Sequence, residues 1–157
     1  MKFLNSPLKT IVTAGLVAGT LDISAAIIQY LIRGGKHPQI IFKYIAGAVF
    51  GSDAYTTGGT GMIICGFLFH YAIAFIFTIL FFFLYPAFVK VIKNAVALGV
   101  VYGLIVWTIM NLLVVPMTKI PSHPFDVQRS IIEALILVFC IGIPISLITS
   151  KYYRGRS

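Results

Sequence analysis

The chain has 157 residues, of which 59% are hydrophobic and only 10% are charged, and its mean hydropathy is +1.00. A soluble domain carries about 25% charged residues to wet its surface, so this composition excludes a soluble globular protein and indicates a single membrane domain. The net charge of +8 does not indicate nucleic-acid binding, because the basic residues stand in ones to threes at the ends of apolar segments, as membrane anchors do.

Four apolar segments are long enough to cross a bilayer. A helix rises about 1.5 Å per residue, so roughly 20 residues cross a hydrocarbon core of about 30 Å. In chain order, the predicted spans are residues 10–32, 61–85, 94–115 and 130–150. Prolines close the second and third spans, and Pro144 is expected to kink the fourth. We therefore predict an all-α integral membrane protein with four transmembrane helices in one domain, residues 1–157.

The apolar segment between the first two spans, residues 39–51, is too short to cross. At helical spacing it places apolar side chains on one face: Ile41, Tyr44, Ile45 and Ala48. This pattern predicts a short helix that lies at the membrane interface or dips back into the bundle. The following residues, 52–61, are rich in Gly, Ser and Thr and predict a flexible loop.

The distribution of Lys and Arg gives an expected orientation. Cytoplasmic loops carry an excess of these residues. Placing both termini in the cytoplasm puts seven of the basic residues there and five on the opposite side. This small excess favours a multi-pass topology with both termini cytoplasmic.

Two spans carry a GxxxG pattern, which lets helix backbones approach closely. In the first span the pattern is Gly15 and Gly19, and continuing along the same stripe gives Asp22, Ala26 and Gln29. In the third span it is Gly99 and Gly103. These faces are interpreted either as packing surfaces inside the bundle or as the seam of a homodimer.

Polar side chains at membrane depth form the main functional signal. Asp22 lies near the middle of the first span, where an ionised Asp costs roughly 2.5–3.5 kcal/mol, so it should face inward and find a partner. If the four helices alternate in direction, the polar residues collect in the half of the membrane that carries the two long loops. The predicted pocket contains Asp22, Gln29, His70, Asn111 and Glu133, with His123 in the loop above it.

Each of these residues also has a structural interpretation. Asp22 could only fix the register of neighbouring helices, His70 could satisfy one carbonyl group, and Asn111 could join two helices by a hydrogen bond. The Ser130 to Glu133 segment matches a capping box, in which Glu133 reaches back to the helix start. Alternatively, Asp126 is the cap and Glu133 lies inside the first turns.

The sequence assigns no catalytic residue, metal or cofactor. One imidazole and two carboxylates suit Fe, Mn or Zn by type, but no spacing such as HExxH supports a metal site. No motif places a nucleophile beside His70. An acid and a histidine facing a wet cavity are typical of a proton relay or a pH-responsive element.

Several motifs between Gly59 and Phe139 occur in a definite order. They are His70 in a Phe-rich span, Tyr85-Pro86, Gly99 with Gly103, Val115-Pro116, the loop from Ile120 to Phe125, and Glu133. This order resembles the YagU-type family of small bacterial inner-membrane proteins. The resemblance implies a multi-span protein of the bacterial inner membrane, and it supplies no catalytic residues.

Three functional hypotheses follow. The first is a non-enzymatic membrane protein whose polar pocket, open toward the non-cytoplasmic side, relays or senses protons or a small solute. The second is a structural or accessory subunit that packs through its GxxxG faces against a copy of itself or within a larger membrane complex. The third is an intramembrane enzyme acting on lipid. In all three the bilayer is the surrounding partner, and no nucleic acid is involved.

Overall fold

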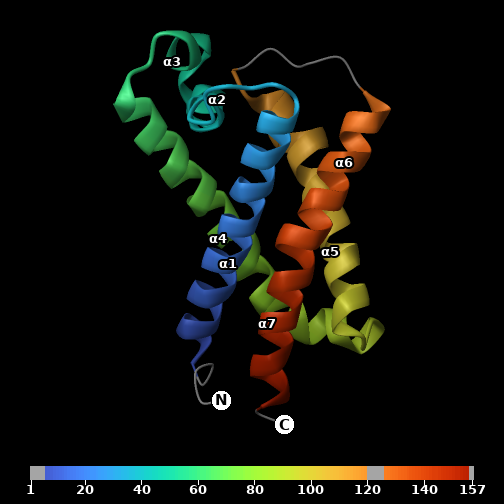
Figure 1. Cartoon of the computed structure of the whole chain (residues 1–157). Helices are drawn as coiled ribbons and strands as arrows, with labels where there is room; N and C mark the ends of the chain where they lie inside the picture. The colour runs from blue at the N-terminus through green and yellow to red at the C-terminus, as the bar shows by residue number, and fades with distance from the viewer. Residues whose placement is uncertain (1–5, 120–125, 156–157) are drawn as a thin grey trace.

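The computed structural model describes residues 6–119 and 126–155, and these residues form helices and no strand (Figure 1). The helices are α1 (Pro7–Ile32), α2 (Ile40–Phe50), α3 (Ser52–Thr56), α4 (Thr60–Val91), α5 (Ala95–Ile109), α6 (Val127–Leu137) and α7 (Ile143–Arg154). A π-helical segment η2 (Met110–Val114) and a 3-10 turn η3 (Val115–Met117) continue α5, and a second π-helical segment, η4 (Val138–Gly142), joins α6 to α7.

Four continuous helices are long and apolar enough to cross a membrane: Pro7–Ile32, Thr60–Val91, Ala95–Met117 and Val127–Arg154. The shorter apolar helix α2 accompanies them. The prediction of an all-α protein with four membrane-length helices and one short helix is therefore confirmed.

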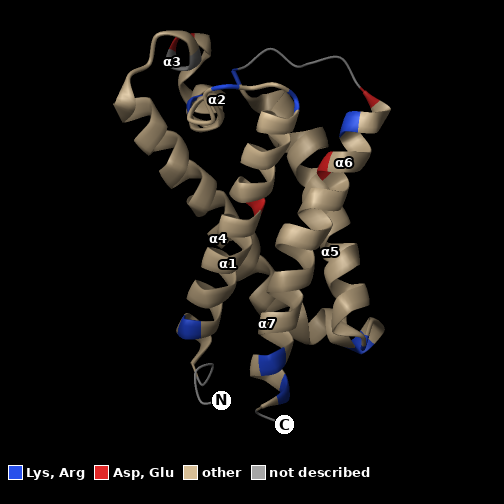
Figure 2. Cartoon of the chain, viewed as in Figure 1, with Lys and Arg blue, Asp and Glu red and all other residues tan. Residues whose placement is uncertain are grey.

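The four long helices alternate in direction, so both ends of the described chain lie at one end of the bundle (Figure 1). Helices α2 and α3 lie at the opposite end. Lys and Arg occur at the two ends and are absent from the long helical stretches between them in the described part of the chain (Figure 2). This arrangement leaves an apolar band around the middle of the bundle, which matches a hydrocarbon solvent.

Polar side chains define the starts of three long helices. The Ser6 hydroxyl accepts a hydrogen bond from the Lys9 amide at the start of α1, and the Asn94 side chain accepts from two amides at the start of α5. Asp126 accepts from the amides of Gln128 and Arg129 at the start of α6. Each cap satisfies backbone donors that have no partner within the helix.

Helix α4 continues past Pro86 to Val91, whereas the sequence predicted an end at Tyr85. Proline has no amide hydrogen, so the carbonyl group four residues earlier, that of Phe82, loses its usual donor. The Tyr153 hydroxyl from α7 donates a hydrogen bond of 3.1 Å to this carbonyl oxygen. The helix therefore continues because a neighbouring helix replaces the missing hydrogen bond.

The segment predicted to be a loop, residues 52–61, contains the short helix α3. Gly51 has a φ of +94°, a conformation that residues with a Cβ rarely adopt, and it turns the chain between α2 and α3. The Thr57 hydroxyl donates to the Asp53 carbonyl oxygen at the end of α3. Gly51 thus lets the chain reverse while a short helical turn still forms.

Both GxxxG faces pack against helices of the same chain. A Cβ atom on Gly19 would lie 3.0 Å from the Tyr71 ring of α4, and one on Gly15 would lie 2.5 Å from the Phe75 ring. On the other face, a Cβ atom on Gly99 would lie 2.7 Å from the Ile143 Cα, and one on Gly103 would lie 2.5 Å from the Val138 Cα. The glycines therefore bring α1 onto α4 and α5 onto the η4–α7 segment.

The half of the bundle nearest the chain ends is filled by aromatic and aliphatic side chains. The rings of Phe81 and Tyr102 lie 4.5 Å apart, and the Tyr102 hydroxyl donates to the Phe77 carbonyl oxygen at 2.6 Å. The other buried members of this core are Ala18, Tyr85, Leu98 and Ile145, together with Val106 and Ile141, which extend it to the middle of the bundle. This packed half supports the more open half that is covered by α2.

The hydrogen bond from Tyr153 to the Phe82 carbonyl predicts how substitutions at Tyr153 and Pro86 affect stability. Tyr153→Phe keeps the ring contacts with Phe82 and Tyr85 but leaves the Phe82 carbonyl without its donor. We expect it to destabilise the folded protein by about 1 kcal/mol. In a Pro86→Ala background the helix regains its own amide donor, so the same change should cost much less. Unfolding in mixed micelles with increasing SDS measures the effect of Tyr153→Phe on the free energy of unfolding in each background. Equal effects in the two backgrounds would show that the Tyr153 hydroxyl does not replace the missing amide donor.

Candidate functional site

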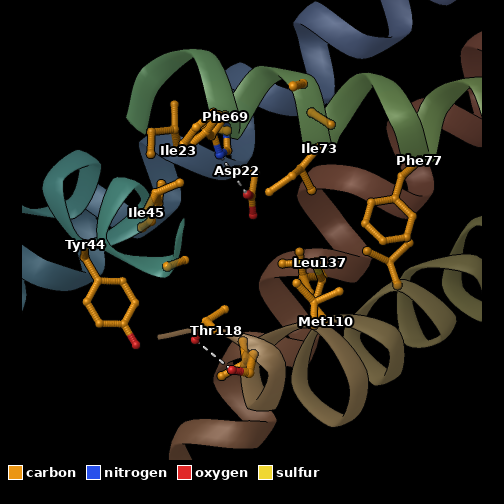
Figure 3. Close-up of a pocket in the computed structure, with 18 of the residues that line it drawn as sticks. Asp22, Ile23, Tyr44, Ile45, Phe69, Ile73, Phe77, Met110, Thr118 and Leu137 are labelled. Carbon is orange, nitrogen blue, oxygen red and sulfur yellow. Dashed lines mark hydrogen bonds and ion pairs between the residues drawn. The ribbon is translucent and has the colours of Figure 1, made fainter. Parts of the chain in front are cut away.

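A cavity of about 730 Å³ lies in the half of the bundle away from the chain ends. Its walls come from α1, α2, α4, the end of α5 with η2 and η3, and the α6–η4 segment. Residues that line it include Ile23, Ile45, Phe69, Ile73, Phe77, Met110, Leu137 and Ile141 (Figure 3). Almost all of this surface is aliphatic or aromatic.

Helix α2 covers the cavity, and two close backbone contacts hold it in place. Gly66 of α4 has no Cβ, so the Phe42 carbonyl oxygen of α2 can touch the α4 backbone at this point. On the opposite side, the Lys119 amide donates a hydrogen bond of 3.1 Å to the Ala48 carbonyl oxygen of α2. The short helix is therefore fixed between α4 and the segment that follows η3.

Asp22 and His70 are the ionisable acid and base in the wall of this cavity. The Asp22 carboxyl group points into the open interior (Figure 3), and its Oδ2 atom lies 4.0 Å from Nδ1 of His70. This distance is too long for a direct hydrogen bond but short enough for a strong interaction between charges in an apolar surrounding. The side chains are 21% and 10% exposed, respectively, so both are largely removed from solvent.

The other ring nitrogen of His70 fixes the tautomer. Nε2 lies 2.8 Å from the Gly19 carbonyl oxygen, and since a carbonyl can only accept, Nε2 must carry the hydrogen. Nδ1, which faces Asp22, therefore either has a free lone pair or carries a second hydrogen as part of an imidazolium ion. The hydrogen bond to the Gly19 carbonyl thus orients the ring so that Nδ1 faces the carboxyl group.

Asp22 and His70 together have three protonation states, which differ in net charge. With one proton present, the two groups are either a neutral acid facing a lone pair or a carboxylate facing an imidazolium ion, and the net charge is zero. With no proton, a carboxylate faces a lone pair and the two repel each other. With two protons, an imidazolium ion is left without an opposite charge. Of the three states, the one with a single proton is therefore the one without a net charge.

Gly19 makes this arrangement possible. A Cβ atom at Gly19 would lie 3.0 Å from the Tyr71 ring and 3.3 Å from the Ala74 Cβ, so a side chain there would push α4 away. Beside this contact, the Thr20 and Tyr71 hydroxyl groups form a hydrogen bond of 2.8 Å. The GxxxG face of α1 therefore positions His70 as well as packing the two helices.

The remaining predicted pocket residues on the long helices do not line the cavity. The Nε2 atom of Gln29 is buried and has no hydrogen-bond partner among the described residues. The Asn111 side chain donates to the Trp107 carbonyl oxygen of its own helix at 3.1 Å. Of the predicted residues within the described chain, the structure brings together Asp22 and His70, and Gln29 and Asn111 lie outside this pair.

Glu133 is also placed away from the cavity. Its Oε1 atom accepts a hydrogen bond of 2.7 Å from Nε of Arg129, one helical turn earlier. Because Asp126 supplies the helix cap, Ser130 and Glu133 do not form the capping box. Glu133 instead forms a partly exposed ion pair near the start of α6. His123 lies outside the described residues.

Sequence reasoning missed the apolar character of the cavity. The wall includes Tyr44, Ile45 and Ala48 of α2, which belong to the face that the sequence predicted for the short helix. The wall also includes Met110, Leu113 and Val114 of η2, which no sequence pattern had marked as pocket residues. No group of three His, Cys, Asp or Glu side chains in the described chain could hold a metal ion.

Both π-helical segments border the cavity. The Val115 amide bonds to the Met110 carbonyl in η2, and the Ile143 amide bonds to the Val138 carbonyl in η4, each five residues back. Pro144 follows η4 and removes a further amide donor from this region. Wide turns of this kind occur frequently at functional sites, since they change the direction of side chains within a helix.

A double-mutant cycle on stability tests whether the Asp22 and His70 side chains interact. Asp22→Leu or His70→Phe alone leaves one polar group unpaired in an apolar cavity, so each should destabilise the protein by about 1–3 kcal/mol. The double variant removes both groups and should cost at least about 1 kcal/mol less than the sum. SDS-induced unfolding measures the cycle. Strict additivity would show that the two side chains do not interact.

Comparison with family models, with curated proteins and with solved structures finds no match to this chain. The resemblance to the YagU-type family therefore stays a prediction.

Proposed function

We propose that this polytopic membrane protein binds a small, largely apolar solute in the cavity and couples binding to the proton held by Asp22 and His70. The observation that carries the proposal is the location of this pair in the wall of an otherwise apolar cavity. We further propose that the protein resides in a bacterial inner membrane with both termini in the cytoplasm. In that orientation the cavity lies in the outer half of the bilayer.

The dimensions of the cavity support a small-molecule ligand. Sites for such ligands occupy about 300–1,000 Å³ and combine apolar walls with a few polar groups that fix orientation. The volume of about 730 Å³ lies within this range. The Asp22–His70 pair would provide the orienting group, while Phe69 and Phe77 would contact the apolar body of the solute.

The proton coupling follows from the cost of charge in this surrounding. A neutral solute is best accommodated when the pair holds one proton and has no net charge. Gaining or losing a proton leaves a net charge beside an apolar ligand, which is unfavourable where little water remains. Solute binding should therefore change the proton occupancy of the pair, and proton occupancy should change solute affinity.

The two other hypotheses have less support. The accessory-subunit hypothesis used the GxxxG faces as the contact with a partner, but both faces are covered by helices of the same chain. The lipid-enzyme hypothesis needs a nucleophile activated by a base. The ring nitrogens of His70 face the Gly19 carbonyl and the Asp22 carboxyl group instead.

Binding of the neutral dye Nile red to the purified protein tests whether the cavity is the binding site. Ala26 lines the cavity, so Ala26→Phe should fill part of it and weaken dye binding by about tenfold. Ala97→Phe adds the same ring on an exposed position of α5 and should bind the dye like the parent. Equal affinities for the two variants would show that the dye does not occupy the cavity.

The pH dependence of the same binding tests the proton coupling. In the parent protein, Nile red affinity should be highest where the pair holds one proton and should fall on both sides of that pH range. Asp22→Asn cannot form a carboxylate, so its affinity should no longer fall at high pH. Asp53→Asn, in α3, should retain the parent profile. An unchanged high-pH decrease in Asp22→Asn would overturn the coupling to Asp22.

A further inference from the structure

The charges around the cavity favour one class of solute. The described residues that line it include Asp22 and His70 but neither Lys nor Arg. An anion would therefore meet a carboxyl group with only one histidine to offset it. A cation would meet a carboxylate after that group releases its proton. The cavity is thus complementary to positive charge once the shared proton has left.

The walls favour an organic cation over a metal ion. Hard metal cations require about six or more oxygen ligands, and transition metals require a set of nitrogen, sulfur or carboxylate ligands. The described lining supplies neither set. Phe69, Phe77 and Tyr44 instead provide aromatic rings in the wall. Aromatic faces attract weakly hydrated organic cations, and the aliphatic side chains between them can contact apolar substituents.

On these grounds we propose that the solute is a lipophilic organic cation that exchanges with the proton shared by Asp22 and His70. This inference rests on the proposed function and specifies its ligand. In the exchange, the proton leaves for water, the Asp22 carboxylate pairs with the entering cation, and neutral His70 keeps its Nε2 hydrogen on the Gly19 carbonyl. One positive charge leaves and one enters, so the net charge of the site is zero in both states.

Other titratable groups around Asp22 do not provide a competing charge. His70 of α4 is the nearest base, and the Cys140 thiol of η4 interacts electrostatically with Asp22. The Tyr44 phenol of α2 also lies in the wall. The Arg129 guanidinium group of α6 is paired with Glu133 and does not line the cavity. Asp22 and His70 therefore determine the proton count of the exchange.

Two ions of almost equal size and shape but opposite charge provide the test. Tetraphenylphosphonium is the cation and tetraphenylborate is the anion, and both are titrated calorimetrically into the full-length protein in detergent. Repeating the titration in buffers with different ionisation enthalpies gives the number of protons released. We expect the cation to bind at least about tenfold more tightly than the anion and to release about one proton per bound ion.

The pH dependence distinguishes exchange from simple attraction. Because binding releases a proton, the affinity for tetraphenylphosphonium should rise by about tenfold per pH unit over the range in which the pair holds its proton. Nile red, which is neutral, should bind less tightly above this pH range, where the pair has lost its proton. Asp22→Asn should abolish both the preference for the cation and the proton release, whereas Asp53→Asn in α3 should retain them.

The possible outcomes separate this inference from the proposed function. Equal or tighter binding of tetraphenylborate, or cation binding without proton release by the parent protein, would overturn the inference. Nile red binding that is weakened by Ala26→Phe and that depends on pH as described above would then still support the proposed function. If Ala26→Phe and Ala97→Phe bind Nile red with equal affinity, the dye does not occupy the cavity, and both the inference and the proposed function are wrong. The proton count is measured on the parent protein, so the test remains decisive even if Asp22→Asn does not fold.

Discussion

A carboxyl group in the middle of a membrane helix needs a partner, and this constraint organises the structure. Asp22 finds that partner in His70 because Gly19 allows α4 to approach α1 closely. The same approach lets Nε2 of His70 donate to the Gly19 carbonyl, which turns Nδ1 toward the carboxyl group. One small residue therefore determines helix packing, the histidine tautomer and the relative position of Asp22 and His70.

The bundle divides into a packed half and a hollow half. Aromatic contacts among Phe81, Tyr102 and Tyr85 fill the half near the chain ends, and Tyr153 lets α4 continue through Pro86. In the other half, α2 covers a cavity whose wall includes both π-helical segments. Rigid packing on one side thus supports a site whose wall contains less regular helix. This division is consistent with ligand binding in one half of the bilayer.

The sequence predicted the long helices, because each is marked by its own run of apolar residues. It also predicted that Asp22 and His70 lie at a similar membrane depth, because the helices alternate in direction. Other contacts depend on tertiary structure. The end of the second span at Pro86 was not predicted correctly, because the hydrogen bond that rescues the helix comes from Tyr153, distant in sequence. Depth alone could not show that Asn111 bonds within its own helix or that Glu133 pairs with Arg129. Residues at the same membrane depth can face different directions, and hydropathy does not show how each helix is rotated about its own axis.

The most direct test of the central claim is the protonation of the His70 ring in a bilayer. Solid-state NMR on protein with ¹⁵N-labelled histidine can identify the His70 signals by their loss in His70→Gln. The structure predicts that Nε2 carries the hydrogen that it donates to the Gly19 carbonyl and that the chemical shift of Nδ1 changes when Asp22 is replaced by Asn. A bare Nε2 with a hydrogen on Nδ1, or an Nδ1 signal that is unchanged in Asp22→Asn, would contradict the pairing of these two side chains.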